Sequence, residues 1–262
     1  MLLKGIVLAV SNIFERKHEV GHVIDGRYEV KEFLGMGSYG CSYLVFDQTS
    51  KLMKVLKILR FHKRIRNSGR KSFFREMELL KNLDHPHFPR FYEKGEYEGV
   101  PYFTMEYIKG KTFEQLIFEE GKTYTEIEAF KLGLQLLSLM ESLHEVEIVH
   151  RDIRIPNVMF MDETIKLIDF GLARPLDEHN PQSDKNGLKE VSITTDYYSL
   201  GHFLLFLLYS QYEASEKAKE KSWEEELEIS ELSKKCIKRL LLSDIPYASA
   251  TEIRKDFNKI IS

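Results

Sequence analysis

The periodicity of the sequence changes near residue 108, and this change limits the fold more than any other feature. Before it, turn residues separate short runs rich in β-branched and aromatic side chains, which is typical of strands. These strands are expected at residues 28–34, 41–46, 53–59 and 102–107. One run with helical spacing, Ser72–Leu83, interrupts them. We therefore expect an α+β protein whose first lobe is a small antiparallel sheet with one helix.

The second part of the chain is predicted to be helical. Thr112 with Gln115, and Thr125 with Glu128, have the spacing of capping boxes that open helices. Further helical segments are expected at residues 197–209, which are apolar on all sides, and at residues 213–231 and 232–242. Two short apolar runs, at 158–160 and 165–168, are the right size for a hairpin, and residues 177–190 read as a polar loop. The result is a larger, mainly helical lobe.

Composition narrows the setting of the protein. The 262 residues are 43% hydrophobic and 30% charged, with a formal net charge of −3, so nothing draws the whole chain toward nucleic acid or an anionic membrane. The two cysteines, Cys41 and Cys236, are far apart and suit a reducing cytoplasm. No apolar run is long enough to span a bilayer. Residues 1–22 have apolar residues at helical spacing, which fits either a helix packed on the domain or a segment that docks on a membrane surface or a partner.

A glycine-rich stretch lies between two predicted strands. Residues 35–40 read Gly-Met-Gly-Ser-Tyr-Gly, and the missing side chains would let backbone N–H groups approach phosphates closely. A plain hairpin turn is the alternative. A dinucleotide-binding fingerprint is disfavoured, because it leads from a strand into a helix.

Charged residues at two further places complete a set. Lys57 lies in an apolar strand, where it could reach solvent, but Glu76 in the following helix could pair with it and hold its ammonium group for phosphates. Residues 150–157 read His-Arg-Asp-Ile-Arg-Ile-Pro-Asn, and Asp169-Phe170-Gly171 follows. In order, spacing and context these five features resemble the eukaryotic-like (Hanks-type) protein kinase family, of the compact bacterial serine/threonine type. The resemblance extends from about Tyr28 to the end of the chain and implies the two-lobed protein kinase fold.

The resemblance implies a role for each matching residue. Asp152 would orient the attacking hydroxyl and accept its proton, while Asn157 and Asp169 would bind Mg²⁺. Lys57, fixed by Glu76, would bind the α- and β-phosphates of ATP. Phosphoryl transfer to protein hydroxyls, including those of the chain itself, is the implied activity.

The family's nucleotide contacts also carry over by position. Met105 matches the gatekeeper, the backbones of Glu106 and Ile108 would bond the adenine edge, and apolar side chains would enclose the ring. The full set of implied ATP-binding positions is Leu34, Gly35, Gly37, Ser38, Tyr39, Gly40, Ser42, Val55, Lys57, Met105, Glu106, Ile108, Met159 and Ile168. Two of these depart from the family, with Val55 in place of alanine and Ser42 in place of valine.

Two other departures leave alternatives open. Arg154, which we count among the catalytic candidates, replaces the lysine that usually contacts the transferred phosphate. No Ala-Pro-Glu occurs between Asp169 and Asp196, so peptide recognition is less certain than nucleotide binding. A phosphotransferase for a small or specialised substrate, and an ATP-binding pseudokinase scaffold, are the alternatives to a serine/threonine kinase. The expected division of the chain is 1–22, 23–107 and 108–262.

Overall fold

The computed structural model describes residues 17–262 except residues 38, 61–62, 64–66, 177–190 and 213–220. The chain forms two compact units, one that ends at Lys109 and one that begins at Gly110. The predicted polar loop at 177–190 lies outside the described residues, as does the N-terminal segment up to residue 16. Residues 17–22 are not helical, and the ring of His18 stacks on that of His22 beside Tyr97.

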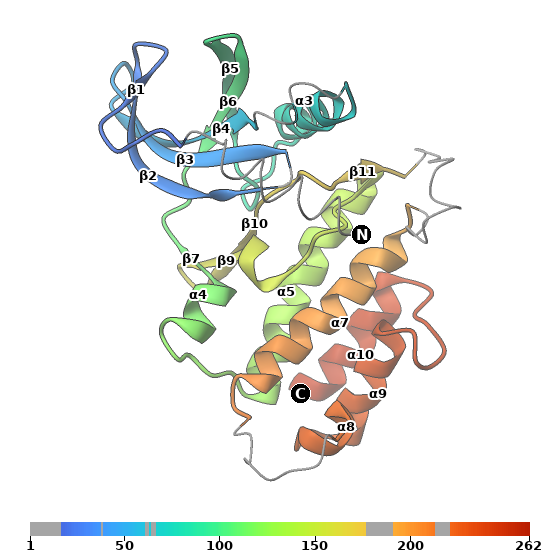
Figure 1. Ribbon diagram of the computed structural model, residues 1–262. Helices are drawn as coiled ribbons and strands as arrows, with labels where there is room; N and C mark the ends of the chain where they lie inside the picture. Colours follow the sequence, from blue (N-terminus) through green and yellow to red (C-terminus); the bar gives the residue numbers. More distant parts are fainter. Residues whose placement is uncertain (1–16, 38, 61–62, 64–66, 177–190, 213–220) are drawn as a thin grey trace, which may run out of the picture. The chain divides into compact units, whose positions relative to one another are not determined.

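The first unit is built on one six-stranded antiparallel sheet with the order β1-β2-β3-β4-β6-β5 (Figure 1). Its strands are β1 (Val23–Ile24), β2 (Tyr28–Met36), β3 (Gly40–Asp47), β4 (Leu52–Leu59), β5 (Phe91–Tyr97) and β6 (Val100–Glu106). The expected strands correspond to β2, β3, β4 and β6. Strand β5 was not predicted, although its tight turn through Glu98 and Gly99, both with positive φ, is the backbone of a hairpin.

Helix α3 (Asn67–Asn82) packs on this sheet. Its buried face carries Phe73, Met77 and Leu80, the apolar residues that the sequence places on one side. The ring of Phe73 lies 5.2 Å from that of Phe103 in β6. The helix is thereby fixed against the sheet face that β4 and β6 share.

The second unit is a helical bundle with two small sheets. The helices are α4 (Phe113–Phe118), α5 (Glu126–Glu145), α7 (Ile193–Tyr209), α8 (Trp223–Glu226), α9 (Glu231–Leu240) and α10 (Ala250–Ile261), with the 3-10 turn η1 (Ile155–Asn157). The strands are β7 (Lys111–Thr112), β8 (Ile148–Val149), β9 (Val158–Met161), β10 (Thr164–Leu167) and β11 (Arg174–Pro175), paired in the orders β10-β9-β7 and β11-β8. Figure 1 shows α5, α7, α9 and α10 packed side by side.

Local sequence explains the start of these helices. Both predicted capping boxes are present, since Thr112 and Thr125 accept hydrogen bonds from the backbone of Gln115 and Glu128, whose side chains return the bond. Helix α7 is buried as expected for an apolar helix, with Leu200, Phe203 and Leu204 at most 1% exposed. No helix in the described part of the chain is long and apolar enough to cross a membrane.

The prediction of continuous helix over 213–231 is wrong within the described residues. Only α8 is helical there, and Leu227 returns to an extended conformation with its side chain buried. Ser230 then caps α9 and bonds through both its backbone N–H and its hydroxyl to Glu126 of α5. The chain between α8 and α9 is thus anchored by a long-range contact that the charge pattern alone does not indicate.

Candidate active site

One face of the sheet in the first unit gathers the predicted phosphate and adenine residues of the middle strands. In the β3–β4 ladder Ser42 lies opposite Lys57, and in the β4–β6 ladder Val55 lies opposite Met105. Gly40, two residues from Ser42, shares its face because side chains alternate along a strand. The register therefore brings together residues that are distant in sequence.

Lys57 and Glu76 form the predicted ion pair. Lys57 Nζ lies 2.5 Å from Glu76 Oε1, and the side chains are 4% and 1% exposed. Strand β4 presents the lysine and the buried face of α3 presents the glutamate. A buried ammonium held in this way has a fixed position and can bind an anion only in a defined direction.

The glycine-rich loop joins β2 to β3 and closes through a hydrogen bond from the Gly37 N–H to the Gly40 carbonyl, 2.9 Å long. Ser38 lies outside the described residues. Tyr39 accepts a backbone bond from Arg60 at 3.0 Å, which ties the loop to the end of β4. At Gly40 a Cβ atom would lie 2.8 Å from Lys57 Cγ, so glycine is required for the lysine stem to pass.

The other predicted adenine contacts of this unit lie at its edges. Leu34 is 42% exposed, whereas Ile108 is buried. The Glu106 N–H donates to the Arg90 carbonyl at 2.8 Å, so a bond from this backbone to adenine would have to use the carbonyl. Gly35 lies opposite Ser42 in the β2–β3 ladder.

In the second unit a buried aspartate holds the catalytic loop. Asp196 of α7 accepts the backbone N–H groups of His150 at 2.9 Å and Arg151 at 2.8 Å. Its Oδ2 also lies 2.9 Å from His144 Nε2 of α5, a partner that the sequence did not suggest. Arg151 has a positive φ of 67°, so these bonds fix a backbone conformation that arginine rarely adopts.

Two side chains bond the Asp152 carboxylate. Asn157 Nδ2 donates to the Asp152 carbonyl at 2.8 Å and to its Oδ2 at 2.9 Å. Arg154 places Nε 2.8 Å from Oδ1 and Nη2 3.2 Å from Oδ2. The carboxylate is therefore oriented by an amide and by a guanidinium fork, and its side chain stays 17% exposed.

Asn157 and Asp169 lie at the same end of the β9–β10 hairpin. Val158 pairs with Leu167, and the Ile168 N–H donates to the Asn157 carbonyl at 2.9 Å. The Asn157 amide nitrogen bonds Asp152, so the amide oxygen of Asn157 is oriented away and can bind a cation. Asp169 supplies a carboxylate, which accepts the Gly171 N–H at 3.2 Å. This oxygen donor set fits a hard divalent cation that takes its other ligands from phosphate and water.

The same hairpin carries the last two predicted adenine contacts. Met159 lies opposite Lys166, one pair away from the buried Val158–Leu167 pair, and Ile168 follows directly. Alternation along the strands places Met159 and Ile168 on the half-buried face of the hairpin.

His150 and Phe170 form the base of this loop. Both are buried, with ring centroids 4.9 Å apart. Burial lowers the pKa of His150, although Asp196, Asp169 and Asp152 act in the opposite direction. A neutral imidazole follows, and its Nδ1 accepts the Asp152 N–H at 3.3 Å.

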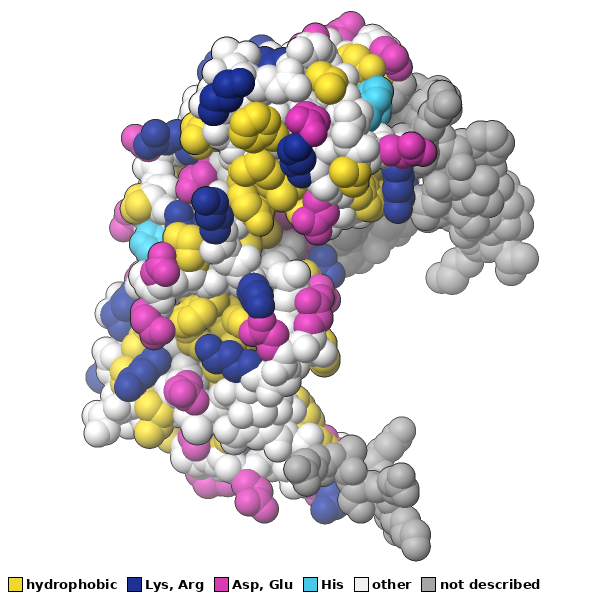
Figure 2. Space-filling model, turned by 90° about the vertical axis from the view of Figure 1, so that its left-hand side faces the viewer, with side chains coloured by type: hydrophobic (Ala, Val, Ile, Leu, Met, Phe, Trp, Pro, Cys, Tyr) yellow, Lys and Arg dark blue, Asp and Glu magenta, His cyan; other side chains and the backbone are white. Residues whose placement is uncertain are grey.

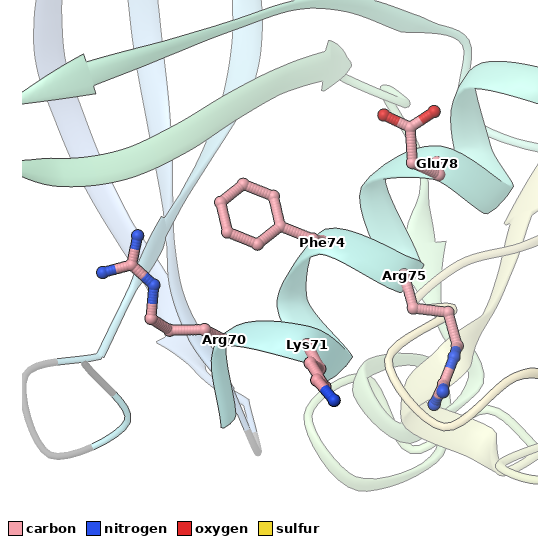
Figure 3. Close-up of a pocket in the computed structure, with 5 residues that line it drawn as sticks. All are labelled: Arg70, Lys71, Phe74, Arg75 and Glu78. Carbon is pink, nitrogen blue, oxygen red and sulfur yellow. The ribbon is translucent and has the colours of Figure 1, made fainter. Parts of the chain in front are cut away.

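The outer face of α3 carries three basic side chains around a hollow. Figure 3 shows five side chains around a shallow hollow of about 470 Å³. They are Arg70, Lys71, Phe74, Arg75 and Glu78. Their helical spacing separates them from the buried face with Glu76, so this hollow is not part of the Lys57 site.

Comparison with known proteins gives a consistent result. The family model described as protein kinase domain matches residues 28–262. The probable serine/threonine-protein kinase YbdM of Bacillus subtilis is 38% identical over 249 residues, which cover 95% of each chain. The serine/threonine-protein kinase PrkC of the same organism is 31% identical over 72% of this chain and 31% of its own. In structure, the PknI kinase domain of Mycobacterium tuberculosis matches with a TM-score of 0.68 at 21% identity over 93% of this chain and 99% of that domain.

Proposed function

This chain belongs to the protein kinase family, and we propose that it is a serine/threonine protein kinase that transfers the γ-phosphoryl group of ATP to protein hydroxyls. The family uses ATP and a divalent metal. The observation that carries the proposal is the group formed by Asp152, Asn157 and Asp169, in which one carboxylate faces solvent and two oxygen donors lie at one hairpin end. The bacterial relatives named serine/threonine kinases support the choice of acceptor.

The proposed roles follow from these positions. Asp152 accepts the proton of the attacking hydroxyl, and Lys57, held by Glu76, binds the α- and β-phosphates. We propose Mg²⁺ as the cation, held by Asn157 Oδ1 and the Asp169 carboxylate. When bound, it would neutralise charge on the phosphates. The adenine is proposed to lie against Leu34, Val55, Met159 and Ile168.

The proposal has two further parts, self-phosphorylation and a cytoplasmic location. Self-phosphorylation is proposed, and Ser183, a candidate acceptor, lies outside the described residues. Ser192 is a weaker candidate, because its hydroxyl caps α7 by accepting the Thr194 N–H. We also propose a cytoplasmic location, which suits two buried cysteines in the thiol form.

The test is incubation of the full chain with labelled ATP and Mg²⁺, followed by mapping of the labelled residues. We expect label on serine or threonine with the wild type and none with Asp152→Ala. Chelation should abolish labelling, and Mg²⁺ should restore it better than Ca²⁺, whose larger and looser coordination fits phosphoryl transfer poorly. Nucleotide binding without any label would overturn the proposal in favour of a specialised substrate or a scaffold.

A further inference from the structure

The Asp152 carboxylate has little capacity left for an acceptor hydroxyl. A carboxylate offers about four lone-pair positions. Arg154 Nε uses one at Oδ1, while Arg154 Nη2 and Asn157 Nδ2 use two at Oδ2. The proposed base is therefore covered largely by the guanidinium fork.

The backbone produces this arrangement locally. Arg154 is extended, with φ −146° and ψ 161°, so its side chain projects on the same side as that of Asp152. Ile153 and Ile155, which alternate with them, are buried. The following turn is fixed by Pro156 and by a 2.8 Å hydrogen bond from the Asn157 N–H to the Arg154 carbonyl.

The residue type matters because a lysine could not make the same contact. A guanidinium bonds both oxygens of a carboxylate at once, whereas an ammonium is a point charge. The same fork also suits a phosphate. Arg154 is 61% exposed, so its side chain is free to exchange one anion for the other.

We propose that Arg154 has two alternative partners, the Asp152 carboxylate in the absence of nucleotide and the γ-phosphate of bound ATP. This inference rests on the proposed function. Movement of the fork to the γ-phosphate uncovers Oδ1, where the acceptor hydroxyl then bonds. In the transfer, the hydroxyl proton passes to Asp152, the acceptor O–Pγ bond forms, and the bond from Pγ to the bridging oxygen of the departing ADP breaks. Arg154 neither gains nor loses a proton.

Two partners that compete for one guanidinium must be thermodynamically coupled. Weakening the carboxylate partner should strengthen binding of the γ-phosphate, by the reciprocity that links any two equilibria. ADP lacks that phosphate and serves as the matched ligand. The coupling can be measured by binding alone, without turnover.

The experiment is calorimetric titration of the full chain with ATP and with ADP, each with Mg²⁺, in a cycle of four proteins. These are the wild type, Asp152→Asn, Arg154→Met and the double variant. In the wild-type background we expect Asp152→Asn to raise the preference for ATP over ADP by about fivefold or more. In the Arg154→Met background it should leave that preference unchanged. Arg154→Lys, which keeps the charge and loses the fork, should give a smaller coupling than arginine.

Other results would overturn the inference. An equal shift in both Arg154 backgrounds would show a general charge effect of Asp152, and no shift in the wild-type background would show that the fork does not exchange. Since Arg154 is exposed, the variants should fold, and thermal unfolding of each protein checks this. If Asp152 and Arg154 are coupled in the binding cycle but no serine or threonine is labelled, the inference is supported and the proposed function is refuted. If serine or threonine is labelled but the coupling is absent, the proposed function is supported and the inference is refuted.

Discussion

At the scale of single residues, the active-site candidates are held in place by buried charged side chains. Lys57 and Glu76 are almost fully buried, and Asp196 is fully buried beneath the catalytic loop. Desolvating such groups is costly, and the cost is repaid only while the partners remain. Removal of one partner should therefore be worse than removal of both.

The Lys57–Glu76 pair allows this to be tested. Glu76→Gln leaves a buried ammonium without its counter-charge and should reduce the free energy of unfolding by about 3–5 kcal/mol. The double variant Lys57→Met/Glu76→Leu should recover most of that loss in urea unfolding, while ATP binding stays abolished. As a control, Glu78→Gln disturbs only the exposed Lys81–Glu78 pair at 3.9 Å and should cost less than about 1 kcal/mol. A double variant as unstable as Glu76→Gln would contradict this account.

Asp196→Ala tests the support of the catalytic loop. It leaves the N–H groups of His150 and Arg151 without their acceptor, at a cost of about 1–3 kcal/mol for each buried donor. The incorporation of label from ATP should fall strongly, although Asp196 itself is not proposed to contact a substrate. His144→Gln, which keeps a donor for Oδ2, should retain most of both stability and activity. Full activity in Asp196→Ala would show that the loop keeps its shape unaided.

At the scale of elements, a network of charges joins three strands of the first unit to the turn before β2. Asp47 at the end of β3 accepts Arg27 at 2.7 Å and Lys54 at 2.8 Å, and both cations also reach Glu93 of β5. Asp47 is fully buried and Lys54 nearly so. The network covers the side of β4 opposite Lys57, since residues 54 and 57 have opposite parity along the strand.

This network should make the first unit sensitive to acid. The hydrogen bond from Arg27, with help from Lys54, holds the pKa of Asp47 well below its ordinary range. Its contribution to stability is complete above the unfolded pKa of about 4 and is lost as the pH falls further. Urea unfolding from about pH 6 down to pH 3 should show this loss. Asp47→Asn should be less stable near neutral pH and should lose less on acidification; an unchanged slope would count against the network.

The elements also show how far the sequence could be interpreted. Strands β2, β3 and β4 were predictable because compact turns bound their apolar runs, and α3 because Phe73, Met77 and Leu80 share one face. Strand β5 was missed, since its alternating residues include charged ones, of which Glu93 pairs with Arg27 and Lys54 only in the folded sheet. The residue that caps α9, Ser230, bonds Glu126, 104 residues away, and no local pattern contains that contact.

The site divides in the same way. Motifs identified Asp152, Asn157 and Asp169, but they could not show that the Arg154 fork lies on Asp152, because only the extended backbone at residue 154 decides that geometry. His144 was missed for a similar reason. Its place near the end of α5 becomes meaningful only when α7 brings Asp196 beside it.

At the scale of the whole molecule, the surface and the interior can be compared on the face that Figure 2 shows. On the face in Figure 2, basic and acidic side chains of the described residues are interspersed, in keeping with the net charge of −3. The chain is instead divided by its cores, one sheet-based and one helical. Each unit encloses its own buried side chains.

We therefore expect two transitions in calorimetric unfolding, each sensitive to its own core. Gly95→Ala directs a methyl group at the Tyr102 hydroxyl and should lower the midpoint temperature of the first unit's transition only. Gly201→Ala places a Cβ 3.0 Å from Leu240 Cβ and should lower the midpoint temperature of the second unit's transition only. Overpacking of this kind costs about 1–3 kcal/mol. A single transition that both substitutions shift equally would show that the units unfold together.

Gly40 has a consequence for how such a chain can diverge. Its missing side chain gives room to the Lys57 stem and, in the proposed function, also lets the loop approach phosphate. A descendant that abandoned catalysis would be released from the second demand but not from the first. As long as it kept a lysine in the core of its sheet, it would keep this glycine, and a glycine there is consequently poor proof of activity in a relative.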